Sequence, residues 1–322
     1  MSARVGGRRA GARGARLAVL VLAVALATLL AACGYDATPV PEPAAQAQST
    51  PEPPDCSTTP ADLRSYAPSR SGGAALARIR KADRLVVGVS ADTLLMGSRN
   101  PETNRIEGFD IDLAQRIADE VGVPLQLRVI SAADRIPLLQ GGDLDLVVRN
   151  MTINCDRWTQ VAFSAEYYHS GQKVLLRSDL AKGYNGPADL AGVTVCAPAG
   201  TTSIQNIQDE EPEAEAVAAV NHTGCLVKFQ QGEVDAITGD DVVLAGLAAQ
   251  DPYALVPQQR AFTAEPYGVA ANSKDVDLVA FVNAVLQDYL ADGGWRRSYD
   301  RWLGPYLGAP DASNPPAPRY GR

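Results

Sequence analysis

Leu85-Val86-Val87-Gly88-Val89 gives the clearest indication of the fold class. It is a continuous apolar run, as a strand buried on both faces of a parallel sheet requires. After a polar loop, Asp110 can cap a helix over residues 111–121, whose apolar residues recur every fourth position. Gly122 can end that helix. A buried strand followed by an amphipathic helix predicts an α/β protein.

The same alternation continues along the chain, in two halves. In the first half we expect strands at 125–130 and 144–148 with a helix at 132–140 between them. In the second half we expect strands at 193–196, 216–220 and 234–238, with helices at 203–209 and 225–231. Strands separated by such helices form βαβ units and a parallel sheet. The repetition predicts two similar lobes.

The N-terminus reads as an export signal. Its first 16 residues carry five arginines and no acid, and residues 17–30 are an apolar run too short for a typical membrane-spanning helix. The run ends in Leu30-Ala31-Ala32-Cys33, which resembles the lipobox of bacterial lipoproteins. We therefore expect a signal peptide over 1–32 and a lipid on Cys33. An ordinary cleaved signal with an incidental cysteine is the alternative.

Two segments rich in proline flank the predicted globular part. Residues 33–72 have the composition of an extended tether, and residues 308–322 that of a flexible tail. The folded part is therefore expected within residues 73–307.

Composition excludes several classes of function. The net charge of −8 argues against a nucleic-acid partner, because phosphate binding needs a basic surface. Two histidines and five cysteines leave little material for a metal site, so we expect neither metal nor cofactor. A single long apolar run excludes a polytopic membrane protein.

Ligands of open α/β sheets bind beyond the carboxyl ends of the strands. The residues expected there include cations, hydroxyls and acids: Asp92, Arg149, Asn150, Thr152, Arg157, Thr201, Thr202 and Asp240, with Arg135 on a preceding helix. Arginines and helix-start amides bind carboxylates, and acids bind ammonium groups. Each residue alone has an ordinary explanation as a cap, turn or surface ion pair. Together they suit the zwitterion of an amino acid.

At this point the sequence resembles a known family, the solute-binding proteins of polar amino-acid ABC importers. The resemblance spans about residues 77–303 and rests on five segments: Gly108-Phe109-Asp110-Ile111-Asp112, Met151-Thr152-Ile153-Asn154-Cys155-Asp156-Arg157, Ala199-Gly200-Thr201-Thr202-Ser203, Gly239-Asp240-Asp241 and Pro266-Tyr267-Gly268-Val269. It looks most like actinobacterial lipoproteins that bind glutamate, aspartate or glutamine.

The resemblance implies a periplasmic-binding-protein fold of two lobes, each a parallel-dominated sheet flanked by helices, joined by two hinge crossings near residues 169–173 and 265–269. Lobe 1 would hold residues 73–170 and a return segment, 267–307. Lobe 2 would hold residues 171–266.

The family also implies roles for the candidate residues. Arg157 would bind the α-carboxylate of the ligand, helped by Thr152 and the helix start at Thr201, while Asp240 would hold the α-ammonium. Arg135 would meet a side-chain carboxylate, which favours glutamate or aspartate over asparagine or glutamine. Arg149 and Arg99 are further candidates for that end.

The sequence departs from the family at three places around the ligand. Pro198 stands where many members have lysine, Leu95 and its neighbours stand where an aromatic residue is usual, and Ser90 stands where some acidic-ligand members have arginine. These differences bear on which amino acid is bound and leave the class unchanged.

Four cysteines remain besides Cys33. An even number in an exported chain suggests two disulfides, with three possible pairings. Cys196 and Cys225 fall within one lobe, so we expect Cys196–Cys225, which leaves Cys56–Cys155. Free buried thiols are the alternative.

The sequence thus predicts a monomeric, lipid-anchored receptor on the outer face of the cytoplasmic membrane. It would bind an acidic or polar amino acid by lobe closure and deliver it to the permease of an ABC importer. A sensor that signals through a membrane partner is the alternative. An enzyme such as a dehydratase is disfavoured, because neither His169 nor His222 has a nucleophile beside it in the sequence.

Overall fold

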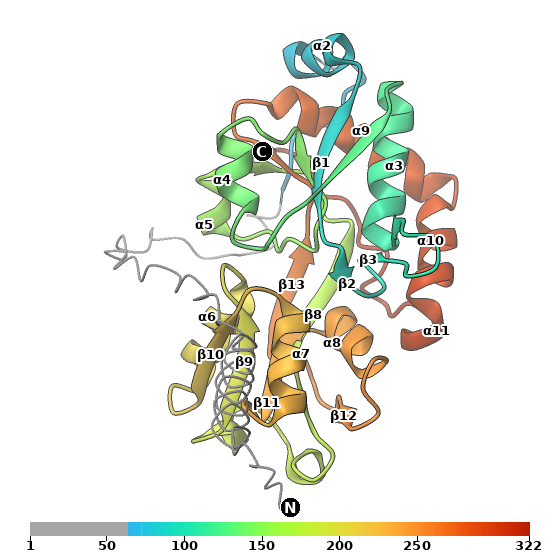
Figure 1. Cartoon of the computed structure of the whole chain (residues 1–322). Coiled ribbons are helices and arrows are strands. Elements are labelled where there is room, and N and C mark those ends of the chain that lie inside the picture. The colour runs from blue at the N-terminus through green and yellow to red at the C-terminus, as the bar shows by residue number, and fades with distance from the viewer. Residues whose placement is uncertain (1–63, 72) are drawn as a thin grey trace, which may run out of the picture. The chain divides into compact units, whose positions relative to one another are not determined.

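The computed structural model describes residues 64–71 and 73–322 (Figure 1). The predicted signal peptide, Cys33, Cys56 and most of the predicted tether lie outside the described residues. Within the described part, the folded chain forms two large sheets and one small one. Each large sheet, with the helices that cover it, makes up one lobe, and we call these lobe 1 and lobe 2.

Lobe 1 contains a five-stranded sheet of order β5-β1-β6-β14-β7. Its strands are β1 (Leu85–Val89), β5 (Leu125–Val129), β6 (Leu146–Val147), β7 (Val161–Phe163) and β14 (Ala270–Asn272). Its helices are α2 (Gly73–Ala82), α3 (Phe109–Val121), α4 (Arg135–Gln140), α5 (Cys155–Trp158), α9 (Val276–Ala291), α10 (Gly294–Trp302) and α11 (Gly304–Leu307). A small sheet lies beside them, made of β2 (Asp92–Thr93), β3 (Gly97–Arg99) and β4 (Ile106–Glu107).

Lobe 2 contains a six-stranded sheet of order β10-β9-β11-β8-β12, with β13 also paired to β8. Its strands are β8 (Tyr168–Arg177), β9 (Thr194–Pro198), β10 (Glu215–Ala219), β11 (Ala236–Asp240), β12 (Ala254–Leu255) and β13 (Thr263–Tyr267). Its helices are η2 (Ala181–Gly183), η3 (Pro187–Leu190), α6 (Thr202–Glu210), α7 (His222–Gln231) and α8 (Asp241–Ala248).

The sheets are mixed rather than dominated by parallel pairs, which corrects the prediction. In lobe 1, β1 is parallel to β5 and β6, whereas β14 is antiparallel to β6 and β7. In lobe 2, β9 is parallel to β10 and β11, whereas β8 is antiparallel to β11, β12 and β13. The parallel pairs are the predicted βαβ units. The antiparallel strands come from the crossings and from the return segment.

Two antiparallel strands, β8 and β13, connect the lobes (Figure 1). Their register pairs Tyr168 with Tyr267 at the lobe 1 end and Gln172 with Thr263 at the lobe 2 end. The chain therefore passes from lobe 1 to lobe 2 along β8 and returns along β13. This two-stranded ribbon is the hinge of the molecule.

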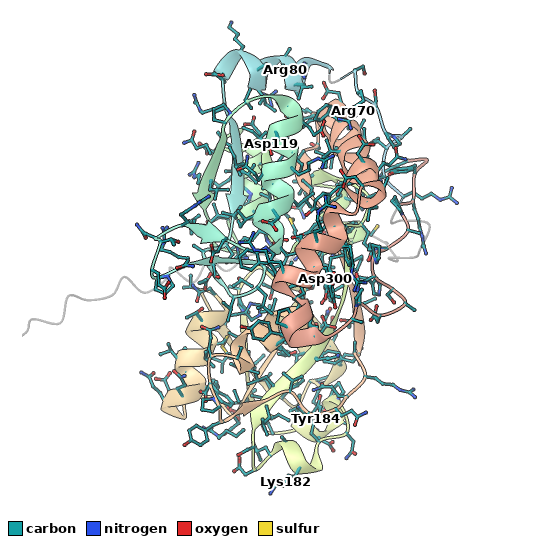
Figure 2. All side chains as sticks on the ribbon, turned by 90° about the vertical axis from the view of Figure 1, so that its right-hand side faces the viewer. Arg70, Arg80, Asp119, Lys182, Tyr184 and Asp300 are labelled. Atoms are coloured by element: carbon teal, nitrogen blue, oxygen red, sulfur yellow. A yellow bond between two sulfur atoms is a disulfide. The ribbon has the colours of Figure 1, made fainter. Side chains whose placement is uncertain are left out.

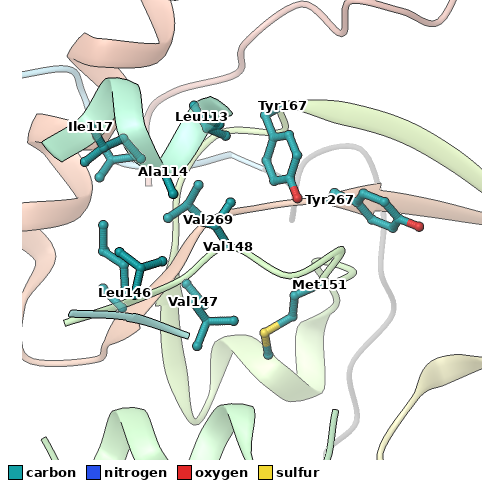
Figure 3. Close-up of a cluster of buried hydrophobic side chains, with 14 of the residues drawn as sticks. Leu113, Ala114, Ile117, Leu146, Val147, Val148, Met151, Tyr167, Tyr267 and Val269 are labelled. Atoms are coloured by element: carbon teal, nitrogen blue, oxygen red, sulfur yellow. The ribbon is translucent and has the colours of Figure 1, made fainter. Parts of the chain in front are cut away.

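The core of lobe 1 lies between α3 and the central strands, where Leu113 and Ile117 of the helix face Leu146 and Val147 of the sheet (Figure 3). Gly88 of β1 allows close packing there, because a Cβ atom at this position would lie 2.7 Å from side-chain atoms of Ile130 and Leu144. The apolar run of β1 is thus buried as the sequence predicts.

The segments predicted to be loose are instead held against lobe 1 where the structure describes them. Arg70 forms ion pairs with Glu120 of α3 and Asp288 of α9, on the face shown in Figure 2. Near the C-terminus, Ser65 bridges to Tyr320, and the Asn314 amide bonds to the backbone of His169. Specific side-chain bonds fix these segments despite their proline-rich composition.

The predicted Cys196–Cys225 disulfide is confirmed, with a Cα–Cα distance of 5.5 Å, and it ties β9 to α7. Cys155 is disulfide-bonded as well, while Cys56, its predicted partner, lies outside the described residues. Among the helices of residues 64–71 and 73–322, none has the length and apolar character needed to cross a membrane.

Candidate functional site

The predicted residues, except Arg99, come together near the carboxyl ends of the parallel strands. In lobe 1, the loop after β6 carries Arg149, Asn150 and Thr152, and α5 carries Arg157. In lobe 2, Thr201 and Thr202 follow β9, and Asp240 ends β11. Parallel strands place these ends at one edge of each sheet, and the two edges face each other across the hinge.

Arg157 is a buried guanidinium on α5. Its Nη1 donates to the carbonyl of Thr152 (2.8 Å), and its Nη2 is 3.5 Å from the carbonyl of Gly200 in lobe 2. Burial lowers the pKa of Arg157, whereas Glu265 and Asp240 raise it. No carboxylate of the described chain forms an ion pair with it. A buried cation without an ion-pair partner suits an anionic ligand group.

Asp240 is a buried carboxylate on the opposite lobe. The hydroxyl of Tyr267 donates to its Oδ2, while its Oδ1 is buried with no hydrogen-bond partner in the part of the chain that the structure describes. Burial and, next, the charge of Glu265 raise the pKa of Asp240 well above its ordinary value. An unpaired buried carboxylate oxygen is costly, so this position suits a ligand cation.

Glu265 of β13 links the two lobes and was not among the predicted site residues. Its Oε2 accepts from the hydroxyls of Thr152 (2.6 Å) in lobe 1 and Thr202 (2.7 Å) in lobe 2. Its Oε1 accepts from Asn206 (2.8 Å) and Thr263 (2.7 Å). The two threonine hydroxyls therefore both donate to Glu265, and their oxygens lie 3.4 Å apart across the lobes.

The turn before α6 holds lobe 2 close to lobe 1. Thr201 is the N-cap of α6, but its hydroxyl donates to the carbonyl of Pro198 (2.7 Å) rather than to the helix. Gly200 has φ +74°, and a Cβ atom there would lie 2.7 Å from the Cα of Ala133. Only glycine combines this backbone conformation with so close an approach.

Arg135 does not present a free guanidinium. Its Nε donates to the carbonyl of Ala132 (2.9 Å) and its Nη2 to that of Gly200 (2.9 Å), while Nη1 lies 3.4 Å and 3.5 Å from the carbonyls of Arg149 and Asn150. Burial and, next, the charge of Arg157 lower its pKa. The guanidinium of Arg135 therefore bridges the two lobes, and its predicted contact with a side-chain carboxylate of the ligand stays a prediction.

Arg149, Asp92 and His222 form a second polar group beside the first. The Nε of Arg149 donates to the carbonyl of Ile130 (3.0 Å), and burial lowers the pKa of Arg149. Asp92 Oδ1 accepts from the Ser90 hydroxyl (2.8 Å), whereas its Oδ2 has no partner among the described atoms. Burial, and next Arg149, lower the pKa of His222 to about 3, so its imidazole is neutral at pH 7.

His222 lies beside Gly239 of β11. A Cβ atom on Gly239, the residue before Asp240, would be 2.8 Å from His222 Nε2, and this nitrogen is buried without a partner within the described chain. The glycine therefore makes room for the imidazole. Gly239 and Asp240 are consecutive residues of β11, whose side chains point to opposite faces of the sheet, so His222 lies on the face away from the Asp240 side chain.

Asp110 shapes the loop that carries Asn150. Asn150 has φ +33°, a left-handed conformation rare outside glycine. Its N–H donates to Asp110 Oδ2 (2.8 Å), and the Tyr167 hydroxyl donates to Oδ1 (2.7 Å). Burial raises the pKa of Asp110 to about 6. Asp110, expected to cap its own helix, instead holds the ligand loop.

Arg99 lies outside the site. It is exposed, and its Nη1 donates to the backbone and side-chain oxygens of Asn104 within the small sheet. Two cavities lie elsewhere on the surface: one of about 560 Å³ beside Arg177, Phe229 and Tyr253, and one of about 360 Å³ beside Arg84 and Asp145. Neither is lined by a predicted ligand residue.

Three buried residues of this region, Glu265, His222 and Tyr267, have roles that sequence reasoning missed. Glu265 and Tyr267 fall in the predicted second crossing, which was a usable signal. His222 had none beyond its place after a predicted strand. Within residues 64–71 and 73–322, no group of three or more histidine, cysteine, aspartate or glutamate side chains is arranged to hold a metal ion.

Two lobes, a two-stranded hinge and a charged region between the strand ends define a solute-binding protein. Comparison with known sequences agrees, and the chain belongs to the bacterial extracellular solute-binding proteins, family 3, which match residues 85–305.

Individual relatives cover most of the same region. The ABC transporter glutamine-binding protein GlnH of Bacillus subtilis is 36% identical over 233 residues, which is 71% of this chain and 84% of the relative. The glutamate-binding protein GluB of Corynebacterium efficiens is 30% identical over 249 residues, 73% of this chain and 84% of the relative. The crystal structure of AncCDT-1, an ancestral amino acid-binding protein and precursor of cyclohexadienyl dehydratase, is 32% identical with a TM-score of 0.67. The match covers 71% of this chain and 100% of the AncCDT-1 chain.

Proposed function

We propose that the protein is an extracytoplasmic receptor for a free amino acid of the glutamine and glutamate type, which it delivers to an ABC importer. One observation carries the proposal. A buried arginine without an ion-pair partner in the described chain, Arg157, and a buried aspartate with an unpaired oxygen, Asp240, come from opposite lobes. The relatives that bind glutamine and glutamate support the class.

In this proposal Arg157 binds the α-carboxylate and Asp240 Oδ1 binds the α-ammonium. Each contact is a charge-assisted hydrogen bond, the stronger kind. Because one group lies on each lobe, a bound zwitterion contacts both and favours the closed arrangement. Thr152 and Thr202 lie beside these groups and can accept from the ammonium through their oxygen lone pairs.

The side-chain end of the site favours an amide. Asp92 Oδ2 is an acceptor without a partner in the described chain, and the guanidinium of Arg149 is a neighbouring donor. A glutamine side chain carries both an N–H donor and a carbonyl acceptor, so it satisfies both groups. Arg135 gives little support to an acid, because its donors already meet backbone carbonyls.

Glutamate and aspartate remain the second candidate. The three buried arginines 135, 149 and 157 leave this region rich in positive charge, which would stabilise a second carboxylate. The asparagine side chain carries the same amide but is one methylene shorter than that of glutamine. Asp92 is the discriminating residue, since it repels an acid and accepts from an amide.

We also propose that a lipid on Cys33 holds the receptor on the outer face of the cytoplasmic membrane as a monomer. The lipobox-like run ending at Cys33 supports this. Mass spectrometry of the protein extracted from its own membrane tests it, because a diacylated N-terminal cysteine has a defined mass. An unmodified chain starting elsewhere would contradict it.

Two other functions share this fold. A sensor would use the same closure, and uptake and signalling in a deletion strain separate sensing from transport. A dehydratase is the enzymatic alternative, and the likeness to a dehydratase precursor is its support. We propose binding without turnover, so each bound amino acid should be recovered unchanged by NMR after prolonged incubation.

The decisive experiment is a thermal-shift panel of the twenty amino acids on the folded domain, followed by calorimetry of each hit. A ligand at 100 times its Kd stabilises the protein by about 2.7 kcal/mol, a shift that melting curves resolve. We expect glutamine to give the largest shift, followed by glutamate. A panel without any stabilising amino acid would overturn the proposal.

A further inference from the structure

The helix that carries Arg157 is too short to be stable without tertiary contacts. α5 spans only Cys155–Trp158, a single turn. Helices this short are unstable in isolation, so tertiary contacts must fix their orientation. Inside the ligand loop, Asn154 caps the helix by accepting from the Arg157 N–H (2.9 Å), and the Arg157 side chain bonds back to Thr152. Further support has to come from outside.

One such contact is the disulfide of Cys155, the first residue of α5. Others come from the two ends of the described chain. Trp158, the last residue of α5, packs edge-on against Tyr66, with ring centroids 6.0 Å apart. The guanidinium carbon of Arg322 lies 3.8 Å from the centre of the Trp158 ring, which is a cation–π contact. Phe163 of β7 packs against the ring edge-on at 5.3 Å. Trp158 is therefore held between the N-terminal and C-terminal segments and the sheet.

The two segments are joined to each other and to lobe 1 through Ser65. The Ser65 N–H donates to the carbonyl of Arg319, and its own carbonyl accepts from the N–H groups of Gly321 and Arg322. Its hydroxyl donates to the carbonyl of Phe163 (2.7 Å) and accepts from Asn283 of α9 (2.8 Å). Ser65 is fully buried by these contacts.

The same C-terminal segment also contacts the hinge. The side-chain amide of Asn314 accepts from the N–H of His169 and donates to its carbonyl, both at 2.8 Å. His169 precedes the residues of β8 that pair with β11, which begin at Gln172. Asn314 therefore occupies an edge of the crossing strand that β11 does not cover, as one residue of an added strand would.

We propose that residues 64–66 and 314–322, the terminal clasp, position the ligand-binding machinery by holding α5, and with it Arg157, and the lobe 1 end of β8. Both segments lie outside the stretch that matches the family, 85–305. The clasp thus lies outside the part of the chain that the family model matches. The inference rests on the proposed function for its effect on ligand affinity, and not for its effect on α5.

The clasp acts on the part of the site that all α-amino acids share. Arg157 is proposed to meet the α-carboxylate, and the hinge moves in every closure. Loosening either therefore weakens all ligands by the same factor and leaves the preference between them unchanged. A residue at the side-chain end of the site would change that preference instead.

Two substitutions test the clasp at its separate contacts. Tyr66→Ala removes the ring that packs on Trp158, and Asn314→Ala removes both bonds to His169. Tyr66→Phe keeps the ring and should restore wild-type behaviour. Asn185→Ala is the matched control, because Asn185 bonds within an exposed loop of lobe 2.

The first readout is hydrogen exchange of residues 155–159 without ligand. We expect faster exchange in Tyr66→Ala and wild-type rates in Tyr66→Phe and Asn185→Ala. The second readout is calorimetry with glutamine and glutamate, where Tyr66→Ala and Asn314→Ala should each raise Kd roughly three- to tenfold for both ligands, the loss of about 0.6 to 1.4 kcal/mol.

The outcomes separate the clasp from the proposed function. If the wild-type protein binds no amino acid, the proposed function fails, and unchanged exchange in Tyr66→Ala would overturn the clasp independently. If the wild type binds and the variants keep its affinity, or lose it for one ligand only, the clasp is overturned. Faster exchange together with uniform weakening supports it.

Discussion

Replacing Asp240 by asparagine should move ligand affinity and stability in opposite directions. Asp240 Oδ1 is buried without a partner among the described residues, and burial raises the pKa of this carboxyl. Without ligand, the carboxylate is therefore a destabilising buried charge, and Asp240→Asn should unfold at the same temperature as the wild type or higher. With ligand, the variant loses a charge-assisted hydrogen bond to the ammonium, which contributes about 1.5 to 3 kcal/mol.

That loss corresponds to a roughly 10- to 150-fold rise in Kd for glutamine. Calorimetry measures it, and differential scanning calorimetry of the same samples gives the melting temperature. Asp241→Asn is the control, since it makes the same change one residue along, where the carboxylate accepts from Ser170 (2.6 Å) instead. Equal losses of affinity in the two variants, or a lower melting temperature for Asp240→Asn with affinity retained, would refute the reasoning.

Three further substitutions or conditions probe other parts of the site. Asp92→Asn should weaken the binding of glutamine and strengthen that of glutamate, shifting the ratio of their Kd values by about tenfold. An unchanged ratio in calorimetry would show that Asp92 does not contact the ligand side chain. Arg135→Met should weaken glutamine and glutamate equally, because it breaks the bridge to Gly200, whereas a loss confined to glutamate would restore the acid-binding role. Between pH 7 and 5, Asp110 takes up a proton and loses one of the two hydrogen bonds that it accepts, so ligand affinity should fall as the pH is lowered. The contribution of this group to the free energy of unfolding should rise over the same range, because its pKa of about 6 in the folded protein exceeds the unfolded value of 3.8. Affinity and unfolding measured across that range in Asp110→Asn should lack both trends.

Part of the site could be predicted from the sequence, because apolar runs mark strands and the carboxyl ends of parallel strands mark ligand sites. Arg157 and Asp240 were found by that rule, and the structure puts them in different lobes. Their roles as ligand contacts remain predictions. Arg99 was suggested by the family resemblance instead, and in the structure it is exposed and bonds to Asn104.

Other features have no local signal in the sequence. The guanidinium of Arg135 donates to backbone carbonyls. Because every residue has a backbone carbonyl, the identity of these partners cannot be predicted from residue types. Glu265 accepts from Thr152 and Thr202, which are 113 and 63 residues away along the chain. The C-terminal segment has the proline-rich composition of a flexible tail, yet a few hydrogen bonds, such as those between Asn314 and His169, hold it in place.

The most direct measurement is a crystal structure of the protein grown with glutamine. We expect a closed form in which the ligand's α-carboxylate lies within about 2.7 to 2.9 Å of the Arg157 guanidinium and its ammonium contacts Asp240 Oδ1. A ligand bound in the opposite orientation, held by one lobe alone, or seated away from both residues would contradict it.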